Sequence, residues 1–189
     1  MILLLGPTGS GKSVQGKMLA NRHGWAWLSA GELLRATNDP KVMELMRQGK
    51  LVPDGLTNQV VFDELAKFPT SEEERKVILD GFPRVAVQAE ALTKHETERL
   101  GREPVDIVID IKMTKKEILA RLKLRGRMED SPEVIEDRLK LHDKETQPLK
   151  DYYEKNGVPI ETVDGVGTVG EVHDRIETKL EQYKITGSF

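Results

Sequence analysis

The feature that most constrains this chain is a glycine-rich loop near its amino terminus, Gly6-Pro7-Thr8-Gly9-Ser10-Gly11-Lys12-Ser13. The loop follows the apolar run Met1–Leu5 and precedes a helical pattern over Ser13–His23, which is the strand–loop–helix context of a phosphate-binding loop. Its glycines let successive backbone N–H groups point at phosphate oxygens, and the helix N-terminus adds its dipole. Lys12 would neutralise the outer phosphates, and Ser13 would offer a hydroxyl to Mg²⁺. The sequence therefore predicts a nucleoside triphosphate site.

Short apolar runs alternate with helical patterns along the rest of the chain. Strands are expected at Met1–Leu5, Trp25–Leu28, Val77–Leu79, Val105–Ile111 and Pro159–Val163. This alternation is typical of a doubly wound α/β fold, here a P-loop NTPase fold with a five-stranded parallel sheet flanked by helices. The helical stretch that starts after Ser131 contains Pro148, which we expect to kink or split it.

Composition narrows the classes of protein further. The 189 residues suit one domain, 1–189, and the net charge of −3 argues against broad binding to nucleic acid. The chain has no cysteine, which excludes a disulfide framework and a thiolate zinc site. The run Met1–Leu5 is too short to span a membrane. We expect a cytoplasmic monomer without a membrane or nucleic-acid partner.

The phosphate loop alone leaves the function open, because GTPases, motor ATPases and small-molecule kinases all use it. The sequence contains no Asn-Lys-x-Asp motif for reading guanine. The strand Val77–Asp80 has the form of a Walker B strand, with Asp80 directed at Mg²⁺ or its waters. Motor ATPases usually end this strand with paired acids, whereas here Gly81 follows and suits close approach of a substrate to the backbone. A small-molecule kinase is the favoured interpretation.

Several further motifs stand in the order and spacing of the adenylate kinase family. They are Leu28-Ser29-Ala30-Gly31-Glu32-Leu33-Leu34-Arg35, Gly49-Lys50-Leu51-Val52-Pro53-Asp54, Asp80-Gly81-Phe82-Pro83-Arg84, and Arg121-x₃-Arg125-Gly-Arg127 followed by Arg138. The chain resembles that family from Met1 to about Leu180. The resemblance implies Mg²⁺-dependent phosphoryl transfer from ATP to AMP, giving two ADP. It also implies a small helical monophosphate-binding segment at about 29–52 and a short lid at about 125–131 without zinc.

The resemblance also assigns roles to individual residues. The residues implied for ATP are Gly9, Ser10, Gly11, Lys12, Ser13, Val14, Arg121, Arg125 and Gly167. The residues implied for AMP are Ala30, Arg35, Lys50, Leu51, Val52, Gly81, Phe82, Pro83, Arg84, Gln88, Arg127 and Arg138. Those implied for catalysis are Lys12, Arg84, Arg121, Arg125, Arg127 and Arg138. Mg²⁺ would be held at Ser13 and Asp80, directly or through water.

Elementary chemistry supports a site built from cations. The attacking oxygen of a monophosphate is already anionic, so the reaction requires positioning, charge neutralisation and exclusion of water rather than a general base. Planar guanidinium groups bind phosphates with paired hydrogen bonds. The four histidines share no metal-ligand spacing and are expected at the surface or at helix ends.

The chain departs from the family's pattern at positions that bear on specificity. Gly-Lys-Ser-Val stands where adenylate kinases usually have Gly-Lys-Gly-Thr, so Ser13 restores a hydroxyl and Val14 removes one. Ala30 stands where adenylate kinases usually have threonine, and the segment around it is more similar to that of uridylate/cytidylate kinases. Gln88, in contrast, matches the glutamine that reads adenine. We give Gln88 more weight, because an amide reads a base edge through paired hydrogen bonds. A uridylate/cytidylate kinase is the alternative, and a nucleotide-dependent switch is a third hypothesis.

Overall fold

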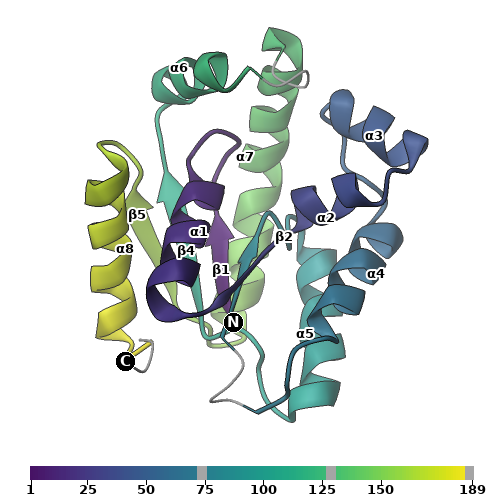
Figure 1. Ribbon diagram of the computed structural model, residues 1–189, viewed down its shortest axis with the longest axis vertical. Helices are drawn as coiled ribbons and strands as arrows, with labels where there is room; N and C mark the ends of the chain where they lie inside the picture. Colours follow the sequence, from purple (N-terminus) through teal and green to yellow (C-terminus); the bar gives the residue numbers. More distant parts are fainter. Residues whose placement is uncertain (72–75, 127–130, 186–189) are drawn as a thin grey trace.

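Residues 1–71, 76–126 and 131–185 are described by a computed structural model of the chain, and their strands form one parallel sheet (Figure 1). Its strands lie in the order β2-β3-β1-β4-β5. They are β1 (Ile2–Leu5), β2 (Ala26–Ser29), β3 (Val77–Asp80), β4 (Ile107–Lys112) and β5 (Ile160–Asp164). The predicted five-stranded parallel α/β fold is confirmed.

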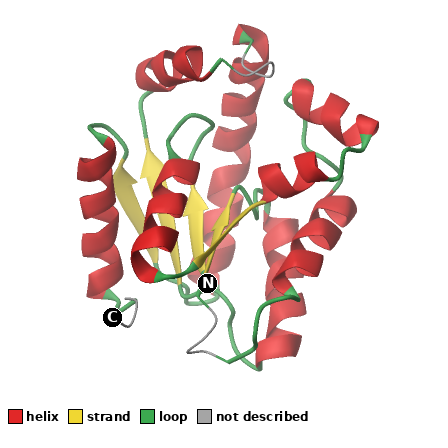
Figure 2. Cartoon of the chain, in the orientation of Figure 1, coloured by secondary structure: helices red, strands yellow, loops and turns green. Residues whose placement is uncertain are grey.

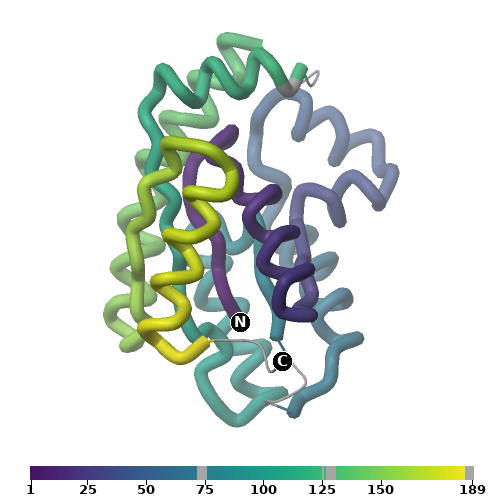
Figure 3. Tube along the Cα trace, turned by 60° about the vertical axis from the view of Figure 1, so that its left-hand side comes forward, coloured from purple at the N-terminus to yellow at the C-terminus, as the bar shows by residue number. Residues whose placement is uncertain are grey.

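Helices cover both faces of the sheet (Figure 2). They are α1 (Lys12–His23), α2 (Ala30–Ala36), α3 (Pro40–Arg47), α4 (Asp54–Leu65), α5 (Ala86–Leu100), α6 (Lys115–Arg125), α7 (Pro132–Lys155) and α8 (Val169–Gln182). Helices α1 and α8 pack on one face, and α4, α5 and α7 contribute to the core on the other. The short helix α3 stands away from the sheet in both views of the chain, whereas α2 follows β2 directly and contacts the sheet (Figure 1, Figure 3).

The position of β1 in the centre of the sheet, covered on both faces, explains why its sequence is continuously apolar. Ile2 and Leu4 point to the core shared with α1 and α8, whereas Leu3 and Leu5 point to the core shared with α5 and α7. Side chains alternate along a strand, so a strand covered on both faces needs apolar residues at every position. Each of these four side chains is no more than 7% exposed.

The order of the strands determines where a ligand can bind. β1 pairs with β3 on one side, Leu4 opposite Asp80, and with β4 on the other, Leu5 opposite Asp110. After β1 the chain forms β2 and β3 on one side of β1 and then β4 and β5 on the other. The carboxyl end of β1 is therefore a topological switch point, where ligands of open α/β sheets bind. The loop after β1 and the end of β3 therefore lie next to each other.

Helix α7 runs without interruption from Pro132 through Pro148 to Lys155, so the expected split at Pro148 is wrong. A proline inside a helix removes one backbone hydrogen bond. Apolar packing on either side, through Leu139 in one cluster and Leu149 in the main core, holds the two halves of α7 in one helix. Tertiary packing thus overrides the local preference.

Two of the histidines lie between α1 and α8 instead of at the surface. His23 does end α1, but it bonds both carboxylate oxygens of Glu177 at 2.9 Å. His173 lies inside α8 with its Nε2 3.2 Å from the same carboxylate. All three side chains are at most 9% exposed. The expectation of a surface or helix-end position is therefore wrong for His173, and the cluster joins the first helix to the last.

We predict that removing the hydroxyl of Tyr153 does not destabilise the protein. The side chain is fully buried, burial raises its pKa, and its hydroxyl has no hydrogen-bond partner among the described residues. Tyr153→Phe should leave the free energy of unfolding unchanged or raise it by up to about 1 kcal/mol, because a buried polar group without a partner is unfavourable. Denaturant unfolding measures this, with Tyr153→Ala as the control that should lose about 3–5 kcal/mol through its cavity. A loss of more than about 1 kcal/mol in Tyr153→Phe would show that the hydroxyl is satisfied.

Candidate functional site

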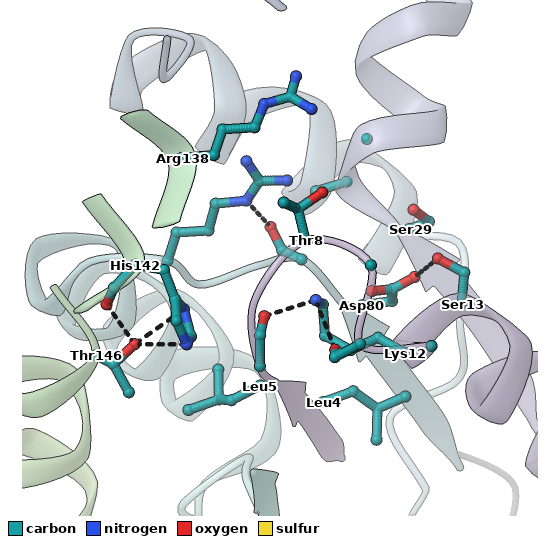
Figure 4. Close-up of a pocket in the computed structure, with 18 of the residues that line it drawn as sticks. Leu4, Leu5, Thr8, Lys12, Ser13, Ser29, Asp80, Arg138, His142 and Thr146 are labelled. Atoms are coloured by element: carbon teal, nitrogen blue, oxygen red, sulfur yellow. Dashed lines mark hydrogen bonds between the residues drawn. The ribbon is translucent and has the colours of Figure 1, made fainter. Parts of the chain in front are cut away.

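A cleft of about 650 Å³ opens at the carboxyl edge of the sheet (Figure 4). Its walls come from the phosphate loop, from α2 and the segment after α3, from the loop after β3, and from α6 and α7. Segments far apart in the sequence therefore converge on one space. The cleft is large enough for small-molecule ligands of nucleotide size.

The phosphate loop has the backbone geometry that only glycine adopts easily. Gly6, Gly9 and Gly11 have φ values of 137°, 82° and 97°, and α1 begins directly after Gly11. A Cβ atom on Gly6 would lie 2.6 Å from the carbonyl oxygen of Ile111, and one on Gly9 would lie 2.9 Å from Cγ of Leu122. The loop is therefore packed closely between β4 and α6 as well as curled around the start of α1.

Lys12 crosses its own loop. Its ammonium group donates hydrogen bonds to the carbonyl oxygens of Gly6 at 2.6 Å and Pro7 at 2.8 Å. Both partners are neutral acceptors, and charge-assisted bonds to anionic phosphate oxygens are stronger. An anion bound in the loop would therefore compete effectively for this ammonium group.

Ser13 and Asp80 meet beside the loop. The hydroxyl of Ser13 donates to a carboxylate oxygen of Asp80 at 2.5 Å, and Asp80 is 3% exposed (Figure 4). The two residues come from α1 and β3, which the strand order brings together. Hydroxyl and carboxylate oxygens are ligands that suit Mg²⁺. In the described part of the chain no group of three or more His, Cys, Asp or Glu side chains could hold a metal ion.

Arginines reach the cleft from four separate elements. Arg121 on α6 donates to the carbonyl oxygens of Gly165 at 3.0 Å and Gly167 at 3.3 Å, which ties α6 to the loop after β5. Arg138 on α7 donates to the carbonyl oxygen of Met46 at 2.8 Å, across the cleft at the end of α3. These contacts hold α6, α7 and α3 around the same space.

The other two arginines of the cleft lie near Asp80. Arg84 donates through Nε to the carbonyl oxygen of Gly81 at 2.9 Å, and its side chain is exposed to the solvent of the cleft. Its charge interacts with those of Asp80 and Arg35. The guanidinium groups of Arg84 and Arg35 therefore share one side of the cleft with the carboxylate of Asp80, and their positive charges would attract an anion.

The cleft collects most of the site residues that the sequence predicts. They are Gly9, Ser10, Gly11, Lys12, Ser13, Val14, Ala30, Arg35, Lys50, Leu51, Val52, Asp80, Gly81, Pro83, Arg84, Gln88, Arg121, Arg138 and Gly167. Phe82 is different, since it is 1% exposed and packs edge-on against Phe62 in the core, so its ring does not face the cleft. The side chain of Arg125 and the whole of Arg127 lie outside the described residues.

His142 also lines the cleft, although the sequence analysis expected it at the surface or at a helix end. It lies inside α7, four residues after Arg138, and its ring contacts the hydroxyl of Thr146 at 3.0 Å (Figure 4). The i, i+4 spacing from Arg138 is the signal that could have identified it, because such residues share one helix face. Burial, and next the positive charge of Lys12, lower the pKa of His142 to about 4.

We predict that His142 makes the protein less stable as the pH falls from about 6.5 to about 4. Its pKa is 6.5 in an unfolded chain and about 4 in the folded protein, so the unfolded chain takes up the proton first. The contribution of neutral His142 to the free energy of unfolding is therefore complete above pH 6.5 and is lost as the pH falls toward 4. Denaturant unfolding across this range should show a shallower pH dependence for His142→Gln than for the parent protein. Parallel curves would contradict the lowered pKa.

Within the described ranges, no helix combines the length and the apolar character needed to cross a bilayer.

Comparison with known proteins identifies the family. The family model for adenylate kinase matches residues 4–158. The chain is 44% identical to an adenylate kinase of Mycolicibacterium paratuberculosis over 181 residues, which cover 92% of this chain and 95% of that protein. It is 37% identical to an adenylate kinase of Thermus thermophilus over 187 residues, with 95% and 96% covered, and 37% identical to one of Bifidobacterium longum over 190 residues, with 95% and 99% covered. The phosphate loop, the arginine-lined cleft and these matches together lead to one conclusion: the chain belongs to the adenylate kinase family.

Proposed function

We propose that this protein transfers the γ-phosphoryl group of Mg²⁺-bound ATP to AMP, giving two ADP, within the single cleft at the carboxyl edge of the sheet. The observation that carries the proposal is the pairing of two cationic regions in that cleft. Lys12 and Ser13 belong to the phosphate loop, whereas Arg35, Arg84 and Arg138 surround a second region next to it. A nucleotide-dependent switch needs one phosphate site, and a second one is useful for transfer.

The ATP half of the site would be the phosphate loop and its neighbours. The loop N–H groups and Lys12 would hold the β- and γ-phosphates, as in other phosphate loops. Arg121 would extend over the phosphates from α6, with Arg125 in the same role. Gly167, whose carbonyl oxygen now accepts from Arg121, would contact the adenine.

The AMP half would lie between α2, the end of α3 and the loop after β3. Arg35, Arg84, Arg127 and Arg138 would bind its phosphate, since planar guanidinium groups pair with phosphate oxygens. The base and ribose would meet the remaining predicted residues, which are Ala30, Lys50, Leu51, Val52, Gly81, Pro83, Gln88 and the backbone of Phe82.

Ser13 and Asp80 fit the Mg²⁺ that accompanies ATP. Their oxygens already meet at 2.5 Å, and Asp80 is buried at the end of β3. We propose that Ser13 contacts the ion directly and that Asp80 holds it or its waters. The ion would neutralise phosphate charge when bound.

The chain's own groups would then act by position and charge. An oxygen of the AMP phosphate attacks the γ-phosphorus as the bond from that phosphorus to the β,γ-bridging oxygen of ATP breaks, and no proton has to be removed. Lys12 and the arginines stabilise the charge spread over the transferred group, which accounts for most catalysis of this reaction. Closure of the lid over the phosphates would exclude water and prevent hydrolysis of ATP.

We predict that AMP is the preferred acceptor. Formation of ADP from ATP should be measured with AMP, CMP, UMP and GMP in parallel. Gln88 favours AMP, whereas the alanine at position 30 favours the alternative, a uridylate/cytidylate kinase. Equal or faster turnover of UMP or CMP would establish that alternative, and no turnover with any acceptor would favour a switch.

We predict that Lys12→Ala lowers kcat by at least about 100-fold while the protein stays folded, because it removes a cation that acts on the transferred group. Lys94→Ala is the matched control, since Lys94 is exposed on α5 outside the cleft. Thermal unfolding of both variants confirms that the fold is kept. Activity within a few-fold of the parent in a folded Lys12→Ala protein would contradict the assigned role.

A further inference from the structure

The amide of Gln88 is held by two protein partners at the edge of the cleft. The backbone N–H of Arg84 donates to its Oε1 at 2.8 Å, and its Nε2 donates to a carboxylate oxygen of Asp54 at 2.7 Å. The Gln88 side chain is buried, at 2% exposed, and lines the cleft. Asp54, at the start of α4, is not among the residues that line the cleft, so it contacts Gln88 from outside the cleft.

The chemistry of these two partners determines which way the amide points. A backbone N–H can only donate, so the atom that faces Arg84 must be the oxygen of Gln88. A carboxylate can only accept, so the atom that faces Asp54 must be the nitrogen. Turning the amide by 180° would place its nitrogen against the backbone N–H of Arg84, so that a donor would face a donor. It would also place its oxygen against the carboxylate of Asp54, so that an acceptor would face an acceptor. Both mismatches would fall on the buried side chain of Gln88, where an unmade hydrogen bond is costly.

A fixed amide presents a fixed pattern to a base. Glutamine has two N–H donors and two acceptor positions on its oxygen, so one of each remains after the contacts with Asp54 and Arg84. Adenine offers an acceptor at N1 and a donor at its 6-amino group, which complement one donor and one acceptor. Hypoxanthine, the base of inosine, and guanine carry a donor at N1 and an acceptor at O6, so their donor and acceptor positions are the reverse of those in adenine. An amide that could turn freely would match either pattern.

We infer that Asp54 is a positioning residue that determines base specificity: it locks the Gln88 amide in the orientation that accepts 6-amino purines and rejects 6-oxo purines. This inference rests on the proposed function, in which the base of the acceptor monophosphate meets Gln88. It assigns Asp54 a role in choosing the substrate and none in the transfer itself.

A purely structural role for the same contacts is the competing interpretation. Gln88 lies in the first turn of α5, and Asp54 lies in the first turn of α4. Both positions suit side chains that stabilise a helix N-terminus. A structural role predicts that loss of Asp54 weakens all acceptors alike, whereas the lock predicts a change in the ratio between acceptors.

The test compares AMP with inosine monophosphate, which differs from AMP only at position 6 and in the hydrogen on N1. Asp54→Asn keeps the shape of the side chain, but its own amide can donate or accept and so can pair with Gln88 in either orientation. We expect the ratio of kcat/KM for AMP to that for inosine monophosphate to fall about tenfold, since one of two orienting contacts is lost. The change should come from a lower KM for inosine monophosphate, with kcat for AMP within about twofold of the parent.

Asp63→Asn is the matched control. Asp63 is an exposed residue on the same helix, so its replacement removes the same charge without touching Gln88. Its ratio between the two acceptors should equal that of the parent protein. Calorimetric binding of AMP and inosine monophosphate to the parent and both variants gives the same comparison without turnover, and thermal unfolding reports the stability of α4.

The outcomes separate the two proposals. An unchanged ratio in Asp54→Asn, with parent activity toward AMP intact, overturns the lock and leaves the proposed function standing. A parallel loss for both acceptors also overturns it, in favour of the structural role. A parent protein that neither binds nor phosphorylates AMP overturns the proposed function, and the lock with it.

Discussion

The site depends on one constraint, the parallel pairing of β1 with β3 on one side and with β4 on the other. This arrangement brings the phosphate loop beside Asp80 and allows the contact between Ser13 and Asp80, two residues far apart in the sequence. It also brings Ile111 close to Gly6, so that position 6 has room for glycine only. If the register of β1 shifted by one residue, its apolar side chains would exchange faces, and the loop would lose both contacts.

Helix α7 connects the stability of the core to the chemistry of the cleft. Its apolar face packs into the core through Leu149 and Tyr153, and Lys150 donates to the buried carboxylate of Asp110 at 3.1 Å. Further along the same helix, Arg138 and His142 face the cleft. An anchor near one end of a helix therefore fixes the position of the side chains that line the cleft near its other end, which is how a rigid element keeps a binding site in shape.

Parts of the site could be predicted from the sequence because their signals are local. The phosphate loop combines glycines, a lysine and a hydroxyl at fixed spacing between a strand and a helix, and Asp80 ends a short buried strand. Gln88 was identified only by resemblance, and nothing in the sequence indicated that Asp54 contacts it. His142 was missed as well, because its environment depends on Lys12 and on the packing of α7, which are far apart in the sequence.

The sequence by itself determined the class of fold and the presence of a phosphate site, since both follow from short-range patterns of apolar residues and glycines. Only the tertiary structure decided how the arginines and Gln88 are arranged, that α7 continues through Pro148, and that His23 of α1 lies buried against Glu177 of α8. The physical reason is that these features are contacts between elements distant in the chain. Their free energy comes from packing and from hydrogen bonds that exist only after the sheet has assembled.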